Sequence, residues 1–385
     1  MSLPEISRRG WLQSAVASAA VGLGRLGWAA VQPSPGPRQA VPSKKDVPWL
    51  AEVQSPPPVL PADAPRLAPL LVDERGSKIT TLAAWQERRE AIRRWWLDFL
   101  KPLEILRQTP PTLEVVGEDR AGGVIRQLVR YAVEPGLTVD AYLLKPALRG
   151  KRPGVAVFHQ TVACSIREPA GVEGRSELAF GLELARRGCV ALCPRNFLWP
   201  ENRALAIATE LPRFQARHPR SKGMAKMLFD AMVAVDILRA LPQVDPRRIG
   251  TIGHSLGAKE ALYLAALDDR VQAAVSSEGG IGTRLSNWHD PWYLGNEILR
   301  DGFGHEHHEL LALVAPRPFL LVGGESVDGA REAGRSSKPR CPCTGYTANR
   351  PASASSVTRK ATPFRPRPRP GSTNGSKRTS EVTLT

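Results

Sequence analysis

The feature that most constrains the fold of this chain is the alternation of apolar strands with helices after Arg152. Apolar runs that predict buried strands are "GVAVFHQT", "CVALCPRN", "RRIGTIGHS", "VQAAVSSEG" and "RPFLLVGGE". The runs "RSELAFGLELARRG", "SKGMAKMLFDAMVAVDILRAL" and "LGAKEALYLAAL" predict helices, the first ending at Gly188 and the second amphipathic. This alternation implies a mostly parallel, doubly wound α/β sheet with both faces covered.

A helix and three further strands are expected ahead of that alternation. Residues 80–100 show the apolar spacing of a helix, with a threonine as a candidate N-terminal cap. The runs "TLEVVGE", "VIRQLVRYAVE" and "LTVDAYLLKP" are separated by turn residues, which predicts antiparallel strands. The predicted domain spans residues 67–330 and has antiparallel strands at its N-terminal side.

The composition permits a large core and argues against a nucleic-acid partner. Of the 385 residues, 42% are hydrophobic and 23% are charged, which is ordinary for a globular protein. Residues 331–385 hold 12 Lys and Arg against 2 Asp and Glu, so they carry 10 of the 16 net positive charges. The rest of the chain shows no basic helix or aromatic-rich basic stripe, although binding of an acidic polymer by the tail stays an alternative.

The N-terminal sequence predicts export from a bacterial cytoplasm. Arg8 and Arg9 precede a short apolar run, and the small residues Ala29 and Ala30 could form a cleavage site. This pattern resembles a twin-arginine signal peptide, which we place at residues 1–31. Residues 32–66 are rich in proline and predict a linker. We therefore expect a periplasmic or extracellular protein with no stable membrane span after signal removal.

The stretch "GTIGHSLGAKEA" places a serine between two glycines, in the pattern G-x-S-x-G. It lies between an expected strand and an expected helix, which predicts a sharp turn that exposes Ser255 as a nucleophile. Gly253 and Gly257 are small because the strand and the helix must approach closely there. The N–H groups of Leu256 and of Gln160, in the loop after "GVAVFHQT", would hold the developing oxyanion. A capping serine in a glycine-rich turn is the alternative.

Other side chains are expected to line the site or to support it. His159 and Thr161 lie in the oxyanion loop, where we favour a structural or substrate-contacting role for the histidine over a role as base. His254 should point away from the nucleophile, and His289 lies in an expected lid. We expect no metal, because the cysteine pair at 341 and 343 has no second pair and the histidines at 305, 307 and 308 suit the start of a helix.

The segments "FHQT", "GTIGHSLGAKEAL", "HHELLALVAPRPFLLV" and "GGESVDG" resemble the dienelactone hydrolase-like and acetyl-xylan-esterase-like branch of the α/β-hydrolases. The resemblance covers about residues 112–330. It implies the α/β-hydrolase fold and hydrolysis of a small-molecule or carbohydrate ester through an acyl-enzyme, with no metal or other cofactor. It also implies a triad acid after the last predicted strand, where we favour Asp328 over Glu325, with Glu278 as a third alternative.

The same resemblance implies a catalytic histidine late in the chain, yet no histidine follows His308. Residues 331–385 lack the apolar period of a strand or helix, so they predict a disordered or out-of-frame tail. A shift of one nucleotide from about Ala333 permits an ending with a histidine codon at the position now read as Thr362. The chain as written would then lack its base, which typically costs on the order of 10⁴- to 10⁶-fold in rate. A non-catalytic binding module is the alternative.

Overall fold

The computed structural model describes residues 67–323, except 74, 108–111, 201–204 and 284–285, together with Gln54 and Thr347–Ala348. The chain divides into two units, Met1–Pro48 and Trp49–Thr385, and all described residues belong to the second. The predicted signal peptide lies outside the described residues, as do the predicted linker apart from Gln54 and the tail apart from Thr347–Ala348. These three boundaries therefore stay predictions.

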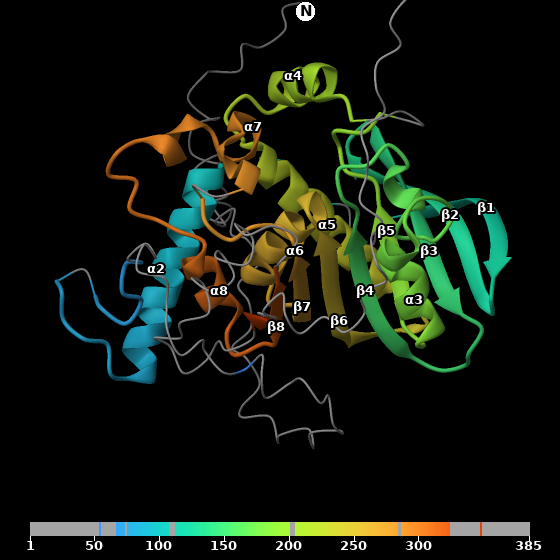
Figure 1. The fold of residues 1–385 in the computed structure, drawn as a ribbon, viewed down its shortest axis with the longest axis horizontal. Coiled ribbons are helices and arrows are strands. Elements are labelled where there is room, and N and C mark those ends of the chain that lie inside the picture. The colour runs from blue at the N-terminus through green and yellow to red at the C-terminus, as the bar shows by residue number, and fades with distance from the viewer. Residues whose placement is uncertain are drawn as a thin grey trace, which may run out of the picture. The chain divides into compact units, whose positions relative to one another are not determined.

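Among the described residues, nine strands form one mixed sheet in the order β1-β2-β3-β5-β4-β6-β7-β8-β9, and Figure 1 shows its central strands side by side. The pairs β1–β2, β2–β3 and β3–β5 are antiparallel, and the other neighbouring pairs are parallel. The strands are β1 Leu113–Ala121, β2 Val124–Glu134, β3 Leu137–Pro146, β4 Arg152–Phe158, β5 Val190–Pro194, β6 Val244–His254, β7 Val271–Ser277, β8 Phe319–Val322 and β9 Thr347–Ala348. The predicted fold class is confirmed; the two-residue β9 was not expected.

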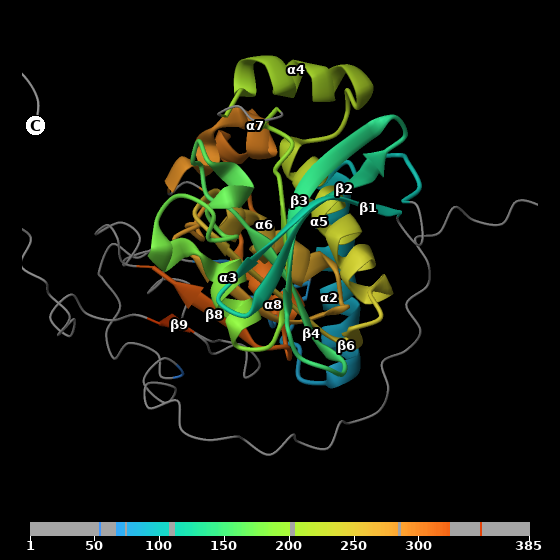
Figure 2. The same ribbon diagram turned by 90° about the vertical axis from the view of Figure 1, so that its right-hand side faces the viewer.

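Successive residues of the central strands feed two separate apolar layers. In β4, Ala156 and Phe158 belong to one buried cluster, whereas Val155 and Val157 belong to the other, because side chains alternate across a strand. The first cluster includes residues of α2 (Leu82–Leu100), α5 (Gly223–Ala240), α6 (Leu256–Leu267) and α8 (His308–Val314). The second includes residues of α3 (Phe180–Arg186). Figure 2 shows α3 on one side of the strands, with α2 and α5 on the other.

Two predicted helices differ from the observed ones. The amphipathic character expected of α5 was wrong: every residue from Gly223 to Leu238 is buried. The sheet covers one side of this helix, and α6 and α7 (Pro291–Leu294) pack against other sides, so the helix is mostly apolar, with Lys226, Asp230 and Asp236 as buried exceptions. No helix in the described part of the chain is both long and apolar enough to cross a lipid bilayer.

The helix expected over residues 175–188 is divided. A 3-10 turn at Ser176–Leu178 is followed by α3, because Ala179 leaves the helical conformation with a ψ of 50°. Close packing accompanies this break, since a Cβ on Gly181 would lie 2.8 Å from the carbonyl oxygen of Pro169. Gly188, with a φ of +91°, follows the end of the helix as the sequence predicted. Helix α4 (Ile207–Arg217) was not expected; it contains a proline.

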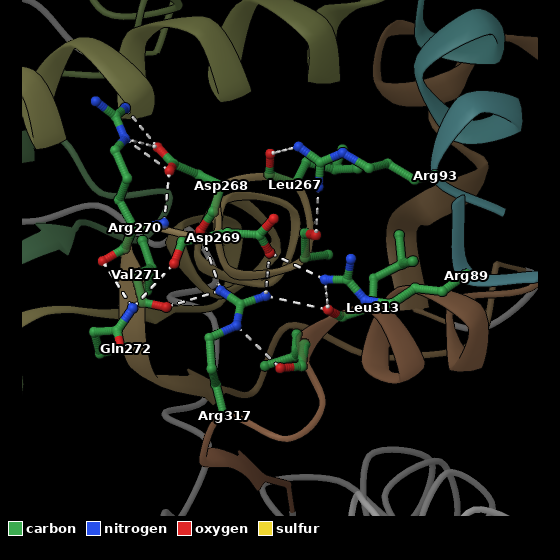
Figure 3. Close-up of polar contacts among 12 residues, drawn as sticks. Arg89, Arg93, Leu267, Asp268, Asp269, Arg270, Val271, Gln272, Leu313 and Arg317 are labelled. Carbon is green, nitrogen blue, oxygen red and sulfur yellow. Dashed lines mark hydrogen bonds and ion pairs between the residues drawn. The ribbon is translucent and has the colours of Figure 1, made fainter. Parts of the chain in front are cut away.

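Three arginines hold the C-terminal end of α6 against its neighbours (Figure 3). Arg93 of α2 donates to the carbonyl oxygens of Ala266 and Leu267, which have no partner within the helix. Arg89 of α2 donates to Asp269 and to the Leu313 carbonyl. Arg317 donates to the carbonyl oxygens of Asp268, Val271 and Val314, and it shares the Leu313 carbonyl with Arg89. The cluster therefore links α2, the C-terminal end of α6 and α8.

Replacing Arg317 tests the weight of this cluster. The substitution Arg317→Met would leave three carbonyl oxygens without a guanidinium donor, because Arg89 still serves Leu313, and we expect the free energy of unfolding to fall by about 2–4 kcal/mol. Arg187→Met is the matched control, since its guanidinium is 73% exposed and pairs only with exposed Glu183; we expect a change within about 0.5 kcal/mol. Urea denaturation measures both, and equal effects of the two substitutions would contradict the assignment.

Candidate active site

Ser255 occupies the single residue between β6 and α6, and its backbone is strained. Its φ of 52° and ψ of −112° lie in a region that side-chain-bearing residues rarely adopt. The Ser255 N–H donates to the Ser277 carbonyl oxygen at 2.8 Å, which fixes the turn to the end of β7. Ser255 is partly exposed, whereas its neighbours His254 and Leu256 are buried. The chain thus presents one serine at the carboxyl edge of a parallel sheet.

The two glycines of the motif make this turn possible. A Cβ on Gly253 would lie 2.0 Å from the carbonyl oxygen of Gly257, so the strand and the helix touch through bare backbone. A Cβ on Gly257 would lie 2.3 Å from the Phe158 carbonyl oxygen and 2.8 Å from that of His159. The same contact therefore brings the first turn of α6 against the end of β4, where the predicted oxyanion loop begins.

The two predicted oxyanion donors lie on these adjoining segments. Leu256 is the first residue of α6, where backbone N–H groups have no acceptor within the helix. Gln160 is held by two contacts: its side-chain amide donates to Glu168 at 2.8 Å, and its carbonyl oxygen lies 2.7 Å from Nδ1 of His159. These contacts fix the backbone of the loop beside the helix. The roles of both N–H groups stay predictions.

His159 is a buried, neutral ring with both nitrogens engaged. The Asn196 N–H donates to Nε2 at 3.2 Å, so Nδ1 carries the proton and donates to the Gln160 carbonyl. Burial lowers the pKa of His159 to about 4, and nearby Arg195 acts in the same direction. This geometry favours the structural role among the interpretations of this residue, because the ring is 3% exposed and its polar atoms face the protein.

The other residues predicted to bind substrate lie partly on the surface and partly in the interior. Thr161 and His289 are exposed, and Nδ1 of His289 lies 2.9 Å from the Ser286 carbonyl oxygen. His254 is buried, and its Nδ1 lies 3.2 Å from the hydroxyl of Ser277, away from the serine that follows it. The structure carries no substrate, so these assignments as substrate-binding residues stay predictions.

All seven histidines of the chain lie in its described part, and the hydrogen bonds assigned to them involve groups other than Ser255. The four histidines outside the elbow and the two expected loops pair with a carboxylate, a tyrosine hydroxyl or a backbone carbonyl: His218 with Glu134, His305 with Glu309, His307 with Tyr263 and Ile281, and His308 with Ala68. The described residues also contain no group of three or more His, Cys, Asp or Glu that could hold a metal ion. The predicted base at position 362 lies outside the described residues.

Of the three predicted acids, only Glu278 is described; Glu325 and Asp328 lie outside the described residues. Glu278 follows the last residue of β7 and has a φ of 58°, a left-handed conformation that is uncommon for a glutamate. Its N–H donates to the Val322 carbonyl oxygen at 2.8 Å. The preceding residue, Ser277, accepts the hydrogen bond from Ser255. Strained backbone therefore occurs on two adjacent strand ends.

A buried polar network beside the site was missed by the sequence analysis. Lys226 Nζ lies 2.8 Å from Glu134 and 2.5 Å from Asp230, and all three side chains are buried. Burial opposes ionisation of Glu134, but Lys226, His218 and Arg217 together lower its pKa to about 2. The available signal was the presence of charged residues inside otherwise apolar helices, at positions 226 and 230 of α5 and 259 and 260 of α6.

Glu260 lies close enough to this network to interact electrostatically with Asp230 and Lys226, and it contacts Asn196. Its Oε2 accepts a hydrogen bond from the side-chain amide of Asn196 at 3.4 Å, and its side chain is buried. Burial raises the pKa of Glu260 well above its ordinary range, and Asp230 adds to the effect. A neutral carboxyl group buried on the nucleophile's own helix is a consequence.

A parallel sheet covered on both faces, with a serine at a strained strand-to-helix turn, defines the α/β-hydrolase class. Comparison with known proteins agrees, because residues 139–290 match the profile of the dienelactone hydrolase family. This part of the chain is therefore similar to the dienelactone hydrolase family, in agreement with the resemblance of the motifs.

Individual relatives match smaller parts of the chain. The hydrolase-like protein YtaP of Bacillus subtilis (strain 168) is 32% identical over 104 residues, which are 26% of this chain and 34% of that protein. A carboxymethylenebutenolidase-like protein of Saccharomyces cerevisiae is 31% identical over 146 residues, or 36% of this chain and 49% of that protein. The chain thus matches half or less of each relative's length. A solved glucuronoyl esterase from Solibacter usitatus shares the fold, with 19% identity and a TM-score of 0.55 over 72% of this chain and 86% of that one.

The buried histidines make the stability of the fold depend on pH. Burial lowers the pKa of His307 to about 3, far below the ordinary value of about 6.5. The unfolded chain therefore takes up this proton first as the pH falls. The stabilisation is fully present above about pH 6.5 and is lost as the pH falls toward the folded pKa. At pH 5 the loss is about 2 kcal/mol relative to pH 8.

We expect His307→Gln to remove the part of this pH dependence that His307 contributes. Denaturation at pH 8 and at pH 5 measures the free energy of unfolding of both proteins. The difference in this free energy between the variant and the unsubstituted chain should be about 2 kcal/mol smaller at pH 5 than at pH 8. His289→Gln is the control, because His289 is exposed and its substitution should leave the pH dependence unchanged. Parallel pH curves for the unsubstituted chain and His307→Gln would contradict the assignment.

Proposed function

We propose that this protein is a carboxylic-ester hydrolase that acts through Ser255. The observation that carries the proposal is the strained backbone of this serine between β6 and α6, in contact with the end of β7. Such strain is retained where it positions a reacting group. Similarity to the dienelactone hydrolase family supports the hydrolase class, and esters are the substrates that suit a serine nucleophile next to backbone donors.

The proposed reaction proceeds in two steps. The Ser255 hydroxyl attacks the ester carbonyl while a histidine takes its proton, and the Leu256 and Gln160 N–H groups stabilise the tetrahedral oxyanion. Departure of the alcohol leaves an acyl-enzyme, which water then hydrolyses with release of the acid. We propose that the histidine comes from the restored frame near position 362, because the described hydrogen bonds of the seven histidines are made elsewhere.

We propose Glu278 as the acid that orients this histidine. The prediction from sequence favoured Asp328, which lies outside the described residues together with Glu325, and the proposal for Glu278 rests on its own backbone geometry. Its left-handed backbone places a carboxylate at the end of β7, one residue from the carbonyl that holds the elbow. A carboxylate at that edge would lie on the strand next to the nucleophile's own strand.

The proposed substrate is an ester of a small molecule or a carbohydrate outside the cytoplasm. The twin arginines at positions 8 and 9 motivate the proposed export. The solved structures with a similar fold include proteins named as glucuronoyl esterases and a candidate acetyl xylan esterase. An ester of a carbohydrate suits both observations.

A non-catalytic binding module is the second candidate, and the engagement of all seven histidines favours it for the chain as written. Treatment with a fluorophosphonate separates the two candidates in the same preparation, because a serine without activation should not react. Rapid labelling at Ser255 would exclude the binding module.

The decisive comparison uses the chain with its frame restored after Ala333. We expect it to hydrolyse p-nitrophenyl acetate at least about 10⁴-fold faster than either the chain as written or the restored chain with Ser255→Ala. If the restored chain and its Ser255→Ala variant give the same rate, the proposal is wrong.

Substitution of the acid candidates distinguishes them. In the restored chain, Glu278→Gln should lower kcat by about 10²- to 10⁴-fold, since a neutral amide cannot stabilise the histidine cation. Asp328→Asn and Glu325→Gln are the matched controls and should lower it less than about fivefold. A large loss with Asp328→Asn and none with Glu278→Gln would reverse the assignment.

A further inference from the structure

We propose that His159, Asn196 and Glu260 are positioning residues that set the distance between the two oxyanion donors. The proposal rests on the proposed function, because a fixed spacing matters only if the elbow serine attacks an ester. One donor, the Leu256 N–H, belongs to α6, and the other, the Gln160 N–H, belongs to the loop after β4. A continuous set of buried hydrogen bonds, made by side chains and by the backbone N–H of Asn196, joins these two segments by way of the residues that follow β5.

The first link connects the oxyanion loop to its own histidine. Nδ1 of His159 donates to the carbonyl oxygen of Gln160 at 2.7 Å. A peptide whose carbonyl is held in this way cannot rotate freely, and the side-chain bond from Gln160 to Glu168 restrains it from the other side. The orientation of the loop backbone thus depends on where the imidazole ring is held.

The second link holds that ring to the end of β5. The backbone N–H of Asn196 donates to Nε2 of His159 at 3.2 Å, and the Ser165 hydroxyl lies 3.4 Å from the same nitrogen. The ring also packs edge-on against Trp199, with centroids 4.7 Å apart and planes at 89°. The indole N–H of Trp199 donates to the Val162 carbonyl, so this aromatic contact returns to the same loop.

The third link reaches the nucleophile's helix. The side-chain amide of Asn196 donates to Oε2 of Glu260 at 3.4 Å, the longest contact of the set, while its Oδ1 accepts from the Leu198 N–H. Glu260 lies on α6, the helix whose first residue is Leu256. Asn196 and Glu260 are 6% and 4% exposed, so water competes little for these bonds. Asn196 therefore contacts both segments that carry the oxyanion donors, through His159 on one side and Glu260 on the other.

This arrangement complements the backbone contact at Gly257. The glycine sets how closely α6 approaches β4, but this steric contact supplies no directional bond between the helix and the oxyanion loop. The side-chain contacts supply this directional restraint, because they attach α6 about one turn beyond the elbow. Errors of about 1 Å in the placement of catalytic groups can cost on the order of 10²-fold in rate.

Hydrogen exchange of the full chain tests the positioning independently of catalysis. Asn196→Ala should accelerate amide exchange in residues 158–163 by at least about tenfold, while exchange within α5 stays unchanged. Thr251→Val is the matched control: it removes a buried polar contact, from Thr251 to the Ala156 carbonyl, outside the proposed set. If residues 158–163 exchange at the same rate in Asn196→Ala as in the control, the positioning proposal is wrong.

Kinetics test whether the positioning serves the reaction. For hydrolysis of p-nitrophenyl acetate above the buffer rate, Asn196→Ala should lower kcat by about 10- to 100-fold and change KM by less than about threefold. A merely structural role would lower the amount of folded protein without this separation of kcat from KM. A proportional rise in KM with unchanged kcat would overturn the proposal.

Paired variants test single links. His159→Asn can keep a donor toward the Gln160 carbonyl, whereas His159→Gln can keep an acceptor for the Asn196 N–H. Each should therefore retain more activity than His159→Leu, which cuts both links. Glu260→Gln preserves an acceptor for Asn196 and should retain kcat within about threefold, while Glu260→Leu should behave like Asn196→Ala. Equal kcat values for the Gln and Leu variants at position 260 would exclude the third link.

The two proposals fail in different ways. If the full chain shows no hydrolysis above the buffer rate and the frame-restored chain shows none that depends on Ser255, the proposed function has failed, and hydrogen exchange still decides whether the three residues hold the loop. If hydrolysis depends on Ser255 but is insensitive to Asn196→Ala and His159→Leu, the proposed function stands and the positioning proposal is overturned.

Discussion

The close contact between Gly253 and Gly257 is the constraint on which the rest of the structure depends. Two backbone segments that touch without side chains between them leave room for a turn of one residue, and Ser255 takes a left-handed conformation to make that turn. The same approach carries Gly257 against the end of β4. The strand, the helix and the loop that would bind the oxyanion are thus brought together by steric fit before any polar contact contributes.

Helix α6 is held at both ends by different interactions. At its start, backbone contacts and the buried pair of Asn196 and Glu260 fix it to β4 and β5. At its end, Arg93 satisfies the last carbonyl groups and links the helix to α2. Buried charged groups cost desolvation free energy, which hydrogen bonds in these clusters offset. Rigid placement of the helix follows, and a rigid scaffold is what preorganised backbone donors require.

Much of the fold was predictable from sequence because apolar period and glycine placement are local signals. They gave the antiparallel strands β1–β3, the parallel core, helix α2 and the turn at Ser255. Tertiary contacts account for the differences: the packing of Gly181 accompanies the break before α3, and α5 is buried from Gly223 to Leu238 because neighbours enclose it on several sides. In the site, the polar connection from His159 through Asn196 to Glu260 joins three distant segments, and no local pattern reports such a connection. The triad acid stayed ambiguous because a carboxylate in a loop has no signature before the strands are assembled.

The central claim is that the Ser255 hydroxyl and two backbone N–H groups converge on one ester carbonyl. A crystal structure of the frame-restored chain after reaction with a fluorophosphonate tests it most directly. The account predicts phosphorus bonded to Oγ of Ser255, with the phosphoryl oxygen within hydrogen-bonding distance of the Leu256 and Gln160 nitrogens. An unmodified Ser255, or an adduct whose phosphoryl oxygen points away from both nitrogens, would contradict it.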